Sequence, residues 1–451
     1  YQAGEGGTRF PFNEGVRVLT PELLLHDDSL VRVDHQEREN YLKLRYPEGE
    51  EYMWISFPRA EDAPAGPDGR VGIDDQPIYD TDELLPVTIP ADTAKQFWIT
   101  VKVPEYLPAG TYRGSVELRS GDEVVDALAL EVEVLPFELE PNPLESSIYF
   151  HWGIELIPEP GSVKYNRRSF SQYRAELHNL LDHGVDNPTL GVRPQSGMLP
   201  VALALRGAVG MANDHLYYLV ARTSLPAERI REIIQIAERF GFDDVYFYGQ
   251  DEARGEALLA QREEWERVHE AGGKVFVAGQ SHEALPLVGD LQDLLVNYGD
   301  PSAEEAAKWH ANGHKIFCYA NPQSGLEEPE TYRRNFGLLL WANDYDGGMT
   351  YIFYHGWNDF SGERYRQHNF IYPTMDGGID TIQWEGYREG IDDLRYLATL
   401  QRAIADAREA GGRRAGLADR AQQFIDTMDV SGDLYAIRDE MIRWTLRLRE
   451  K

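Results

Sequence analysis

The fold is decided by the stretch Asp244-Val245-Tyr246-Phe247-Tyr248-Gly249, which is followed by a helical pattern at 255–271 and by Lys274-Val275-Phe276-Val277-Ala278. Short runs of β-branched and aromatic residues are typical of buried strands, and the longer amphipathic segment between them is typical of a helix. A strand, a helix and a second strand in this order predict a βαβ unit, in which the two strands are parallel.

The same alternation continues on both sides of this unit, from residue 145 to about residue 400. We expect strands at 147–152, 185–190, 216–220, 244–249, 274–278, 294–298, 314–319 and 349–354. We expect helices at 170–183, 227–240, 255–271, 303–312, 331–342 and 386–408. Eight strands alternating with helices predict a (β/α)8 TIM-type barrel over residues 145–400. A doubly wound sheet is the alternative, but no glycine-rich phosphate-binding motif follows the first strand.

The parts of the chain outside the barrel have their own patterns. Residues 1–140 are expected to form a β-sandwich domain, with strands at 97–103, 110–118 and 124–134 and a hairpin turn at Ser120-Gly121-Asp122. The proline-containing stretch 138–144 is the expected linker. Residues 401–451 are expected to form C-terminal helices packed on the barrel, so the fold class is multidomain α/β plus β.

Composition excludes several classes of partner. The 451 residues carry a formal net charge of −32, which disfavours nucleic acid and anionic lipid. No run of eighteen apolar residues predicts a membrane span. Cys318 is the only cysteine, which rules out an intrachain disulfide and a cysteine-rich zinc site.

The N-terminus does not reveal the compartment; a secreted or periplasmic location is favoured over a cytoplasmic one, and the oligomeric state is left open.

The chemistry of a barrel of this kind lies at the C-terminal ends of its strands. Aromatic rings, amides and carboxylates gather there, and such a mixture is typical of a sugar-binding pocket. The sequence therefore predicts a glycan or oligosaccharide substrate. The candidate substrate-binding residues are Trp152, Asn297, Tyr298, Tyr319, Asn321, Tyr354 and Trp357. For Trp357 the alternative is a core aromatic, and for the two asparagines it is capping of the next helix.

The adjacent acids Asp251 and Glu252 end the expected strand at 244–249 and are the candidate catalytic residues. Two neighbouring carboxylates repel each other, which raises the pKa of one of them and suits a general acid. The structural alternative is a helix start, with Asp251 as N-cap and Glu252 in the first turn.

Three segments resemble glycoside hydrolase family 123 and its DUF4091 relatives. Residues 245–252 resemble the family's Asp-Glu motif on strand four. Residues 97–118 resemble its N-terminal β-sandwich, and residues 385–397 resemble its closing helix. The resemblance implies a retaining β-N-acetylhexosaminidase, with N-acetylgalactosamine favoured, in which the 2-acetamido group of the substrate replaces an enzyme nucleophile.

The resemblance also implies roles for individual residues. Glu252 would protonate the leaving oxygen and then activate water, while Asp251 would hold the acetamido N–H. Tyr319 or Tyr298 would assist the acetamido oxygen. The chain departs from the family at Ala253, where proline is common, and near residues 383–384, where an arginine is usual.

Neither a cofactor nor a metal is expected, since His151, His282 and His355 lack the paired spacing of metal ligands. Two other functions stay open. One is an exo-glycosidase of the same fold that acts on a sugar without an acetamido group and uses Asp300, Asp359 or Glu385 as its second carboxylate. The other is a non-catalytic carbohydrate-binding protein.

Overall fold

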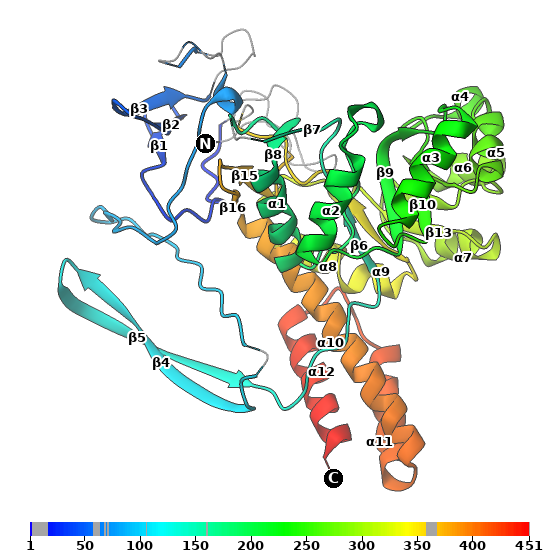
Figure 1. Cartoon of the computed structure of the whole chain (residues 1–451). Coiled ribbons are helices and arrows are strands. Elements are labelled where there is room, and N and C mark those ends of the chain that lie inside the picture. Colours follow the sequence, from blue (N-terminus) through cyan, green and yellow to red (C-terminus); the bar gives the residue numbers. More distant parts are fainter. Residues whose placement is uncertain are drawn as a thin grey trace. The chain divides into compact units, whose positions relative to one another are not determined.

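The computed structural model describes residues 1, 17–56, 64–66, 69, 72–104, 106–158, 161–357 and 368–450 (Figure 1). The chain forms two compact units. The first unit contains residues 1–91 and 144–392, and the second contains residues 92–143 and 393–451.

A seven-stranded sheet forms the centre of the first unit. Its strands in spatial order are β6 (Glu145–Ile148), β14 (Gly347–Thr350), β13 (Lys315–Cys318), β12 (Leu294–Asn297), β11 (Lys274–Gly279), β10 (Asp244–Tyr248) and β9 (His215–Arg222). Every neighbouring pair is parallel. The first strand of the chain segment, β6, pairs with the last, β14, as the strands of a barrel do.

The segment 187–190 connects the two edges of this sheet. On one side, the backbone N–H of Thr189 donates to the carbonyl of Ile148 in β6 (3.0 Å). On the other, the N–H of Leu190 donates to the carbonyl of Tyr217 in β9 (2.7 Å). The expected strand at 185–190 is therefore irregular, because Pro188 has no N–H to donate to a ladder. Its position nevertheless completes a TIM-barrel-like arrangement.

Helices join the strands as expected, with differences in detail. They are α1 (Phe170–Asp182), α2 (Leu199–Val209), α3 (Ala227–Glu238), α4 (Gly255–Leu259), α5 (Arg262–Glu270), α6 (Ser281–Val288), α7 (Ala303–Ala311), α8 (Pro329–Asn335), α9 (Leu338–Ala342) and α10 (Ile382–Ala410). The expected helices at 255–271 and 331–342 are each divided in two, and α2 and α6 are not predicted by the sequence. Within the described ranges, none of the helices has the length and apolarity needed to cross a bilayer.

A three-stranded antiparallel sheet, β1 (Val31–Asp34), β2 (Glu39–Tyr46) and β3 (Gly49–Trp54), belongs to the same unit. Leu42 and Leu44 of β2 share a core cluster with Trp357 and Tyr372. Tyr372 lies in the hairpin of β15 (Ile371–Pro373) and β16 (Gly378–Asp380). The small sheet is therefore held by apolar contacts with the chain that follows the last barrel strand.

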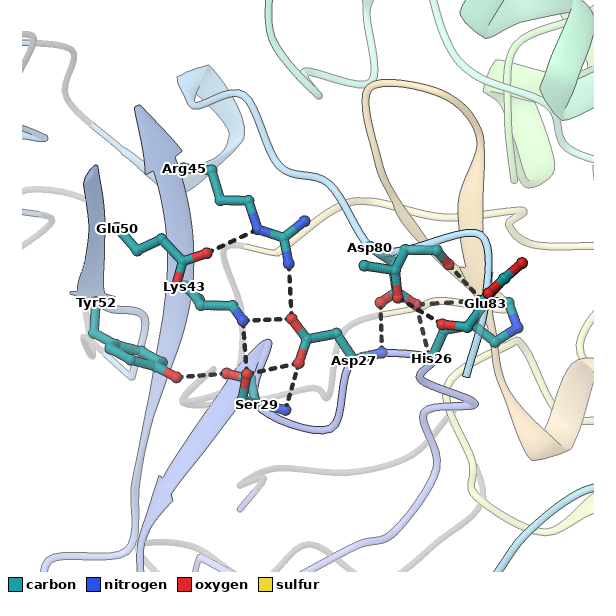
Figure 2. A network of polar contacts seen from close by, with 10 residues as sticks. His26, Asp27, Ser29, Lys43, Arg45, Glu50, Tyr52, Asp80 and Glu83 are labelled. Carbon is teal, nitrogen blue, oxygen red and sulfur yellow. Dashed lines mark hydrogen bonds and ion pairs between the residues drawn. The ribbon is translucent and has the colours of Figure 1, made fainter. Parts of the chain in front are cut away.

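A polar network supports the small sheet (Figure 2). The carboxylate of Asp27 accepts hydrogen bonds from Arg45 Nη2 (2.8 Å), from Ser29 Oγ (2.6 Å) and from Lys43. Burial opposes ionisation of Asp27, but the hydrogen bonds from Lys43 and Ser29 lower its pKa below the usual value. The charged carboxylate thus ties β2 to the turn before β1. Asp80 accepts from the backbone N–H groups of His26 and Asp27 (2.9 Å each) and anchors the other side of this turn.

Among the described residues, the second unit contains a hairpin, the part of α10 from residue 393 onward and two further helices. The hairpin consists of β4 (Gly110–Ser120) and β5 (Glu123–Val134), and confirms the expected strands and turn. The helices are α11 (Gly412–Asp426) and α12 (Leu434–Arg449), at the expected C-terminal end.

The expected strand at 97–103 is wrong. In the described chain this segment lies in no strand, and Phe97, Ile99 and Val101 have exposed fractions of 45%, 56% and 50%. A strand with this apolar pattern needs a second layer to bury its side chains, and the described residues do not supply one at this segment. The described part of 1–140 contains a three-stranded sheet in one unit and a two-stranded hairpin in the other, so the sandwich is not confirmed.

We predict that stability depends on pH through Asp74, which is buried and accepts a hydrogen bond from the backbone N–H of Trp357 (2.8 Å). Burial raises the pKa of Asp74 to about 7. An acid whose pKa rises on folding stabilises the fold below its unfolded pKa, and this contribution is lost as the pH rises through the folded value. The melting temperature of Asp74→Asn minus that of the wild type should therefore become more positive as the pH rises from 5 to 8.

The control for this prediction is Asp75→Asn, which alters a half-buried neighbour that pairs with Lys164 (3.1 Å). Thermal unfolding of all three proteins at several pH values gives the comparison. A difference between wild type and Asp74→Asn that stays constant over this range would contradict the prediction.

Candidate functional site

The two candidate acids lie in a turn directly after β10, at its C-terminal end. Both Asp251 and Glu252 are exposed, so a ligand can reach them. Glu252 has a φ of +48°, in the left-handed region that non-glycine residues seldom adopt, and its N–H donates to the carbonyl of Ala278 (3.1 Å). The helix α4 begins only at Gly255. The structural alternative of a helix start at Asp251 is therefore wrong.

A chain of phenols ends on Asp251. Tyr248 donates to Asp251 Oδ1 (2.6 Å), and the hydroxyl of Tyr149 lies 2.9 Å from that of Tyr248. Burial raises the pKa values of Tyr149 and Tyr248 well above 10, so both keep their protons. Since the proton of Tyr248 points to Asp251, Tyr149 must donate to Tyr248. This arrangement fixes the position of the Asp251 carboxyl group.

The pKa of Asp251 is raised above its usual value. Displacement of water from its carboxyl by the surrounding protein is the largest cause, although the residue as a whole is exposed, and the charge of Glu252 adds to it. The hydrogen bond from Tyr248 and the charge of Arg222 act in the opposite direction. Asp251 is thus a carboxyl group that takes up a proton more readily than a free aspartate does.

Glu252 has its own phenol partner. Tyr319 donates a hydrogen bond to Glu252 Oε1, and Gln323 Nε2 donates to the hydroxyl of Tyr319 (3.3 Å). Burial, followed by the hydrogen bond to Glu252, raises the pKa of Tyr319, so it stays protonated and acts as the donor. The ring of Tyr298 lies 5.7 Å from that of Tyr319. Tyr319, a predicted substrate-binding residue, therefore contacts Glu252, and Tyr298, another one, lies beside Tyr319.

Trp152, a third predicted residue, lies beside the same tyrosines. Its ring is 38% exposed and meets the ring of Tyr248 edge to face at 5.8 Å. The guanidinium of Arg222 lies 5.0 Å from the ring centre of Trp152 and 5.2 Å from that of Tyr248. Arg222 also donates to the carbonyl of Gly249 (2.7 Å), which holds its charge near Asp251. An accessible aromatic face thus lies next to the two acids.

Two other predicted residues are buried instead, and their assignment to the substrate is corrected. The hydroxyl of Tyr354 donates to Glu176 Oε1 (2.5 Å), in a network that includes His151 and Arg168. Trp357 is fully buried in the core cluster and donates through Nε1 to the carbonyl of Pro373 (2.8 Å). Both residues follow β14, which ends at Thr350 rather than at residue 354, so they lie beyond the strand end.

The two asparagines are buried and take part in hydrogen bonds within the fold. Asn297 is buried, accepts from the N–H of Ser281 (3.0 Å) at the start of α6, and donates to the hydroxyl of Tyr345 (3.1 Å). Asn321 is also buried, and Asn335 Nδ2 donates to its backbone carbonyl (2.9 Å). The alternative of a structural role therefore describes both better, although Asn297 supports α6 and not the helix that follows it.

We predict that Trp357→Ala lowers the free energy of unfolding by about 3–5 kcal/mol, because it removes a large aromatic side chain from a closed core. Urea denaturation measures this loss. Trp152→Ala is the matched control: its ring is partly exposed, so it should lose less stability and should weaken glycan binding instead. Equal stability of Trp357→Ala and wild type, together with weaker sugar binding, would contradict this prediction. It would indicate that the Trp357 ring stacks on the sugar.

Several residues of the site are missing from the sequence prediction. Tyr149 and Tyr351 directly follow β6 and β14, and their rings are 5.7 Å apart. The predicted strands extend four residues too far at these two places, so both tyrosines are expected inside strands rather than at their ends. Correct strand ends are the signal that would have found both tyrosines. Arg222 ends β9, and the expected strand at 216–220 stops before it.

Two of the three carboxylates considered for the non-acetamido alternative lie among the described residues. Glu385 lies in the first turn of α10, where it pairs with Arg388 (2.8 Å) and lies 3.5 Å from His183. Asp300 is exposed after β12. Asp359 and its neighbour Asn358 lie outside the described residues.

No protein-family model and no curated protein matches the sequence. Among solved structures, the chain is similar to a family 39 glycoside hydrolase from Bacteroides cellulosilyticus WH2, with 9% identity, a TM-score of 0.37, and coverage of 63% of this chain and 71% of that one. It is similar to the endo-β-1,4-mannanase from Thermotoga petrophila, with 10% identity, a TM-score of 0.33, and coverage of 55% and 77%. It is also similar to a prophage protein of the dihydrodipicolinic acid synthase family from E. coli K12, with 11% identity, a TM-score of 0.31, and coverage of 66% and 87%. Likenesses this distant carry no argument about the reaction.

Proposed function

We propose that this chain is a retaining glycoside hydrolase that removes a terminal β-linked N-acetylhexosamine by substrate-assisted catalysis. One observation carries the proposal. Two neighbouring exposed carboxyl groups lie at the C-terminal end of β10, and each is positioned by a tyrosine hydroxyl. The resemblance of residues 245–252 to glycoside hydrolase family 123 favours N-acetylgalactosamine as the sugar.

In the first step, the carbonyl oxygen of the 2-acetamido group attacks C1 and the bond from C1 to the leaving oxygen breaks. Glu252 gives its proton to that oxygen, so the alcohol departs neutral. Tyr319 holds one carboxyl oxygen of Glu252 and leaves the other to face the substrate. The product bound to the enzyme is an oxazolinium ion.

Asp251 has the complementary task in this step. As a carboxylate it accepts the acetamido N–H and balances the positive charge that develops on the oxazolinium ring. The Tyr149–Tyr248 pair fixes its orientation before the substrate arrives, so no reorganisation is needed during the reaction. Two adjacent residues in a turn present their side chains in different directions, which allows one to reach C2 and the other the leaving oxygen.

In the second step, water attacks C1 from the side that the leaving group vacated. Glu252, now a carboxylate, takes a proton from this water, and the C1–oxygen bond of the oxazolinium ring breaks to restore the acetamido group. Two inversions at C1 give net retention. Trp152 offers an exposed aromatic face next to this position for the sugar ring.

A panel of 4-nitrophenyl β-glycosides tests the proposal. We expect hydrolysis of the N-acetyl-β-D-galactosaminide and inhibition by the matching thiazoline, which mimics the oxazolinium ion. Hydrolysis of galactoside or glucoside alone would favour an enzyme with a carboxylate nucleophile. Binding of the sugars without turnover would favour a carbohydrate-binding protein, and either result would overturn the proposal.

A further inference from the structure

A second group of titratable side chains lies in the first unit, at a different place from Asp251 and Glu252. It consists of His183, Asp380 and Glu385, and one donor atom from each lies within 4.8 Å of the other two. His183 directly follows α1 and precedes the segment 187–190, so it lies toward the N-terminal ends of the barrel strands. The candidate acids lie at the C-terminal ends.

His183 points a buried nitrogen at the two carboxylates. Its side chain is 5% exposed, and its Nδ1 lies 2.8 Å from the carbonyl of Asn179, to which it donates. When the ring is neutral, Nε2 carries the lone pair, and within the described residues this nitrogen makes no hydrogen bond. Nε2 lies 3.5 Å from Glu385 Oε1 and 3.8 Å from Asp380 Oδ2.

The separations of Nε2 from the two carboxylate oxygens are close to those of donor atoms that share one ion. Two ligands at about 2.1 Å from a tetrahedral cation lie roughly 3.4 Å from each other. The other oxygen of each carboxylate is already held: Asn179 Nδ2 donates to Asp380 Oδ1 (2.7 Å), and Arg388 Nε donates to Glu385 Oε2 (2.9 Å). Outer hydrogen bonds of this kind orient metal ligands and leave one atom of each free for the ion.

We propose that His183, Asp380 and Glu385 bind a divalent transition-metal cation, with Zn²⁺ as the best fit to one imidazole and two carboxylates. The side chain of Asp380 is 29% exposed, which gives the ion a path from solvent and leaves room for water as a further ligand. The two carboxylates and Arg388 together carry a charge of −1, so the cation enters a site of opposite sign.

The proposed ion has a structural role. Its ligands come from the end of α1, from the last residue of β16 and from the first turn of α10. It therefore links the first helix of the barrel region to the helix that follows the last strand. The ring of His183 stacks on Trp384 of α10 (4.6 Å between ring centres, 16° between planes), which holds the ligand in place without the ion.

The test uses the full chain after removal of metal with a chelator. Isothermal titration with Zn²⁺ should show one site per chain, and added Zn²⁺ should raise the melting temperature by several degrees. Co²⁺ should give the visible absorption of a low-coordinate site. Asp380→Asn keeps the oxygen that accepts from Asn179, so we expect it to fold and to weaken Zn²⁺ binding by at least about 100-fold.

The matched control is Asp376→Asn, which alters an exposed aspartate in the same β15–β16 hairpin and should leave Zn²⁺ affinity unchanged. A second variant, Glu385→Gln, should behave like Asp380→Asn. Absence of a Zn²⁺ heat and of any thermal shift in the wild type would overturn the proposal. Equal Zn²⁺ affinity in wild type and Asp380→Asn would also overturn it, since the ion would then bind elsewhere.

Discussion

Replacement of Glu252 by glutamine is expected to lower kcat by about 10²- to 10⁴-fold, because the amide can neither protonate the leaving oxygen nor take a proton from water. The loss should be largest for substrates with a poor leaving group, such as an alkyl glycoside, and smaller for 4-nitrophenyl glycosides, whose leaving group needs less protonation. Steady-state kinetics on both substrate types measures the difference. Circular dichroism should show an intact fold, since the glutamine Oε1 can still accept from Tyr319.

Glu256→Gln is the matched control for this prediction. Glu256 is an exposed glutamate in the first turn of α4, four residues after Glu252, and no step of the proposed reaction uses it. Its substitution should leave kcat unchanged. Near-normal turnover by Glu252→Gln on the alkyl glycoside would remove Glu252 as the general acid.

Asp251→Asn is expected to lower kcat by about 10²- to 10³-fold on N-acetylhexosaminides, because the charge that balances the oxazolinium ion is lost. The loss should be similar for good and poor leaving groups, since Asp251 acts on the acetamido group and not on the departing oxygen. This pattern separates the two acids from each other. Tyr248 can still donate to the asparagine oxygen, so the fold should be retained.

The control here is Asp243→Asn, an exposed aspartate just before β10. It should leave kcat unchanged on every substrate. If Asp251→Asn retained full activity on acetamido substrates while Glu252→Gln was inactive, substrate assistance would be excluded, and a separate carboxylate nucleophile would be required.

The barrel could be predicted from local patterns alone. Apolar runs such as 244–248 and 274–278 are buried on both faces, and their alternation with amphipathic helices leaves few other arrangements. The position of Asp251 and Glu252 after β10 follows from the same pattern. The strand at 97–103 failed because a run of β-branched and aromatic residues indicates which side chains need burial, but not whether a second layer covers them.

Among the tyrosines that support the site, Tyr319 was predicted from the sequence, whereas Tyr149 and Tyr248 were not. Tyr149, Tyr248 and Tyr319 lie at the ends of three different strands, and only barrel closure brings their hydroxyl groups to the two acids. Trp357 and Trp152 are both tryptophans near expected strand ends, yet one is buried and the other is exposed. An error of a few residues in a predicted strand end is enough to make a buried tryptophan look like an exposed one.

The sequence by itself determined the order of strands and helices, the absence of a disulfide and the presence of two adjacent acids at a strand end. These properties depend on neighbours along the chain. The tertiary structure alone decided which phenol holds which acid, and it alone brought His183, Asp380 and Glu385 within 4.8 Å of one another. The physical reason is that hydrogen bonds and metal ligation act over a few ångströms in space, while almost two hundred residues of chain separate His183 from Asp380.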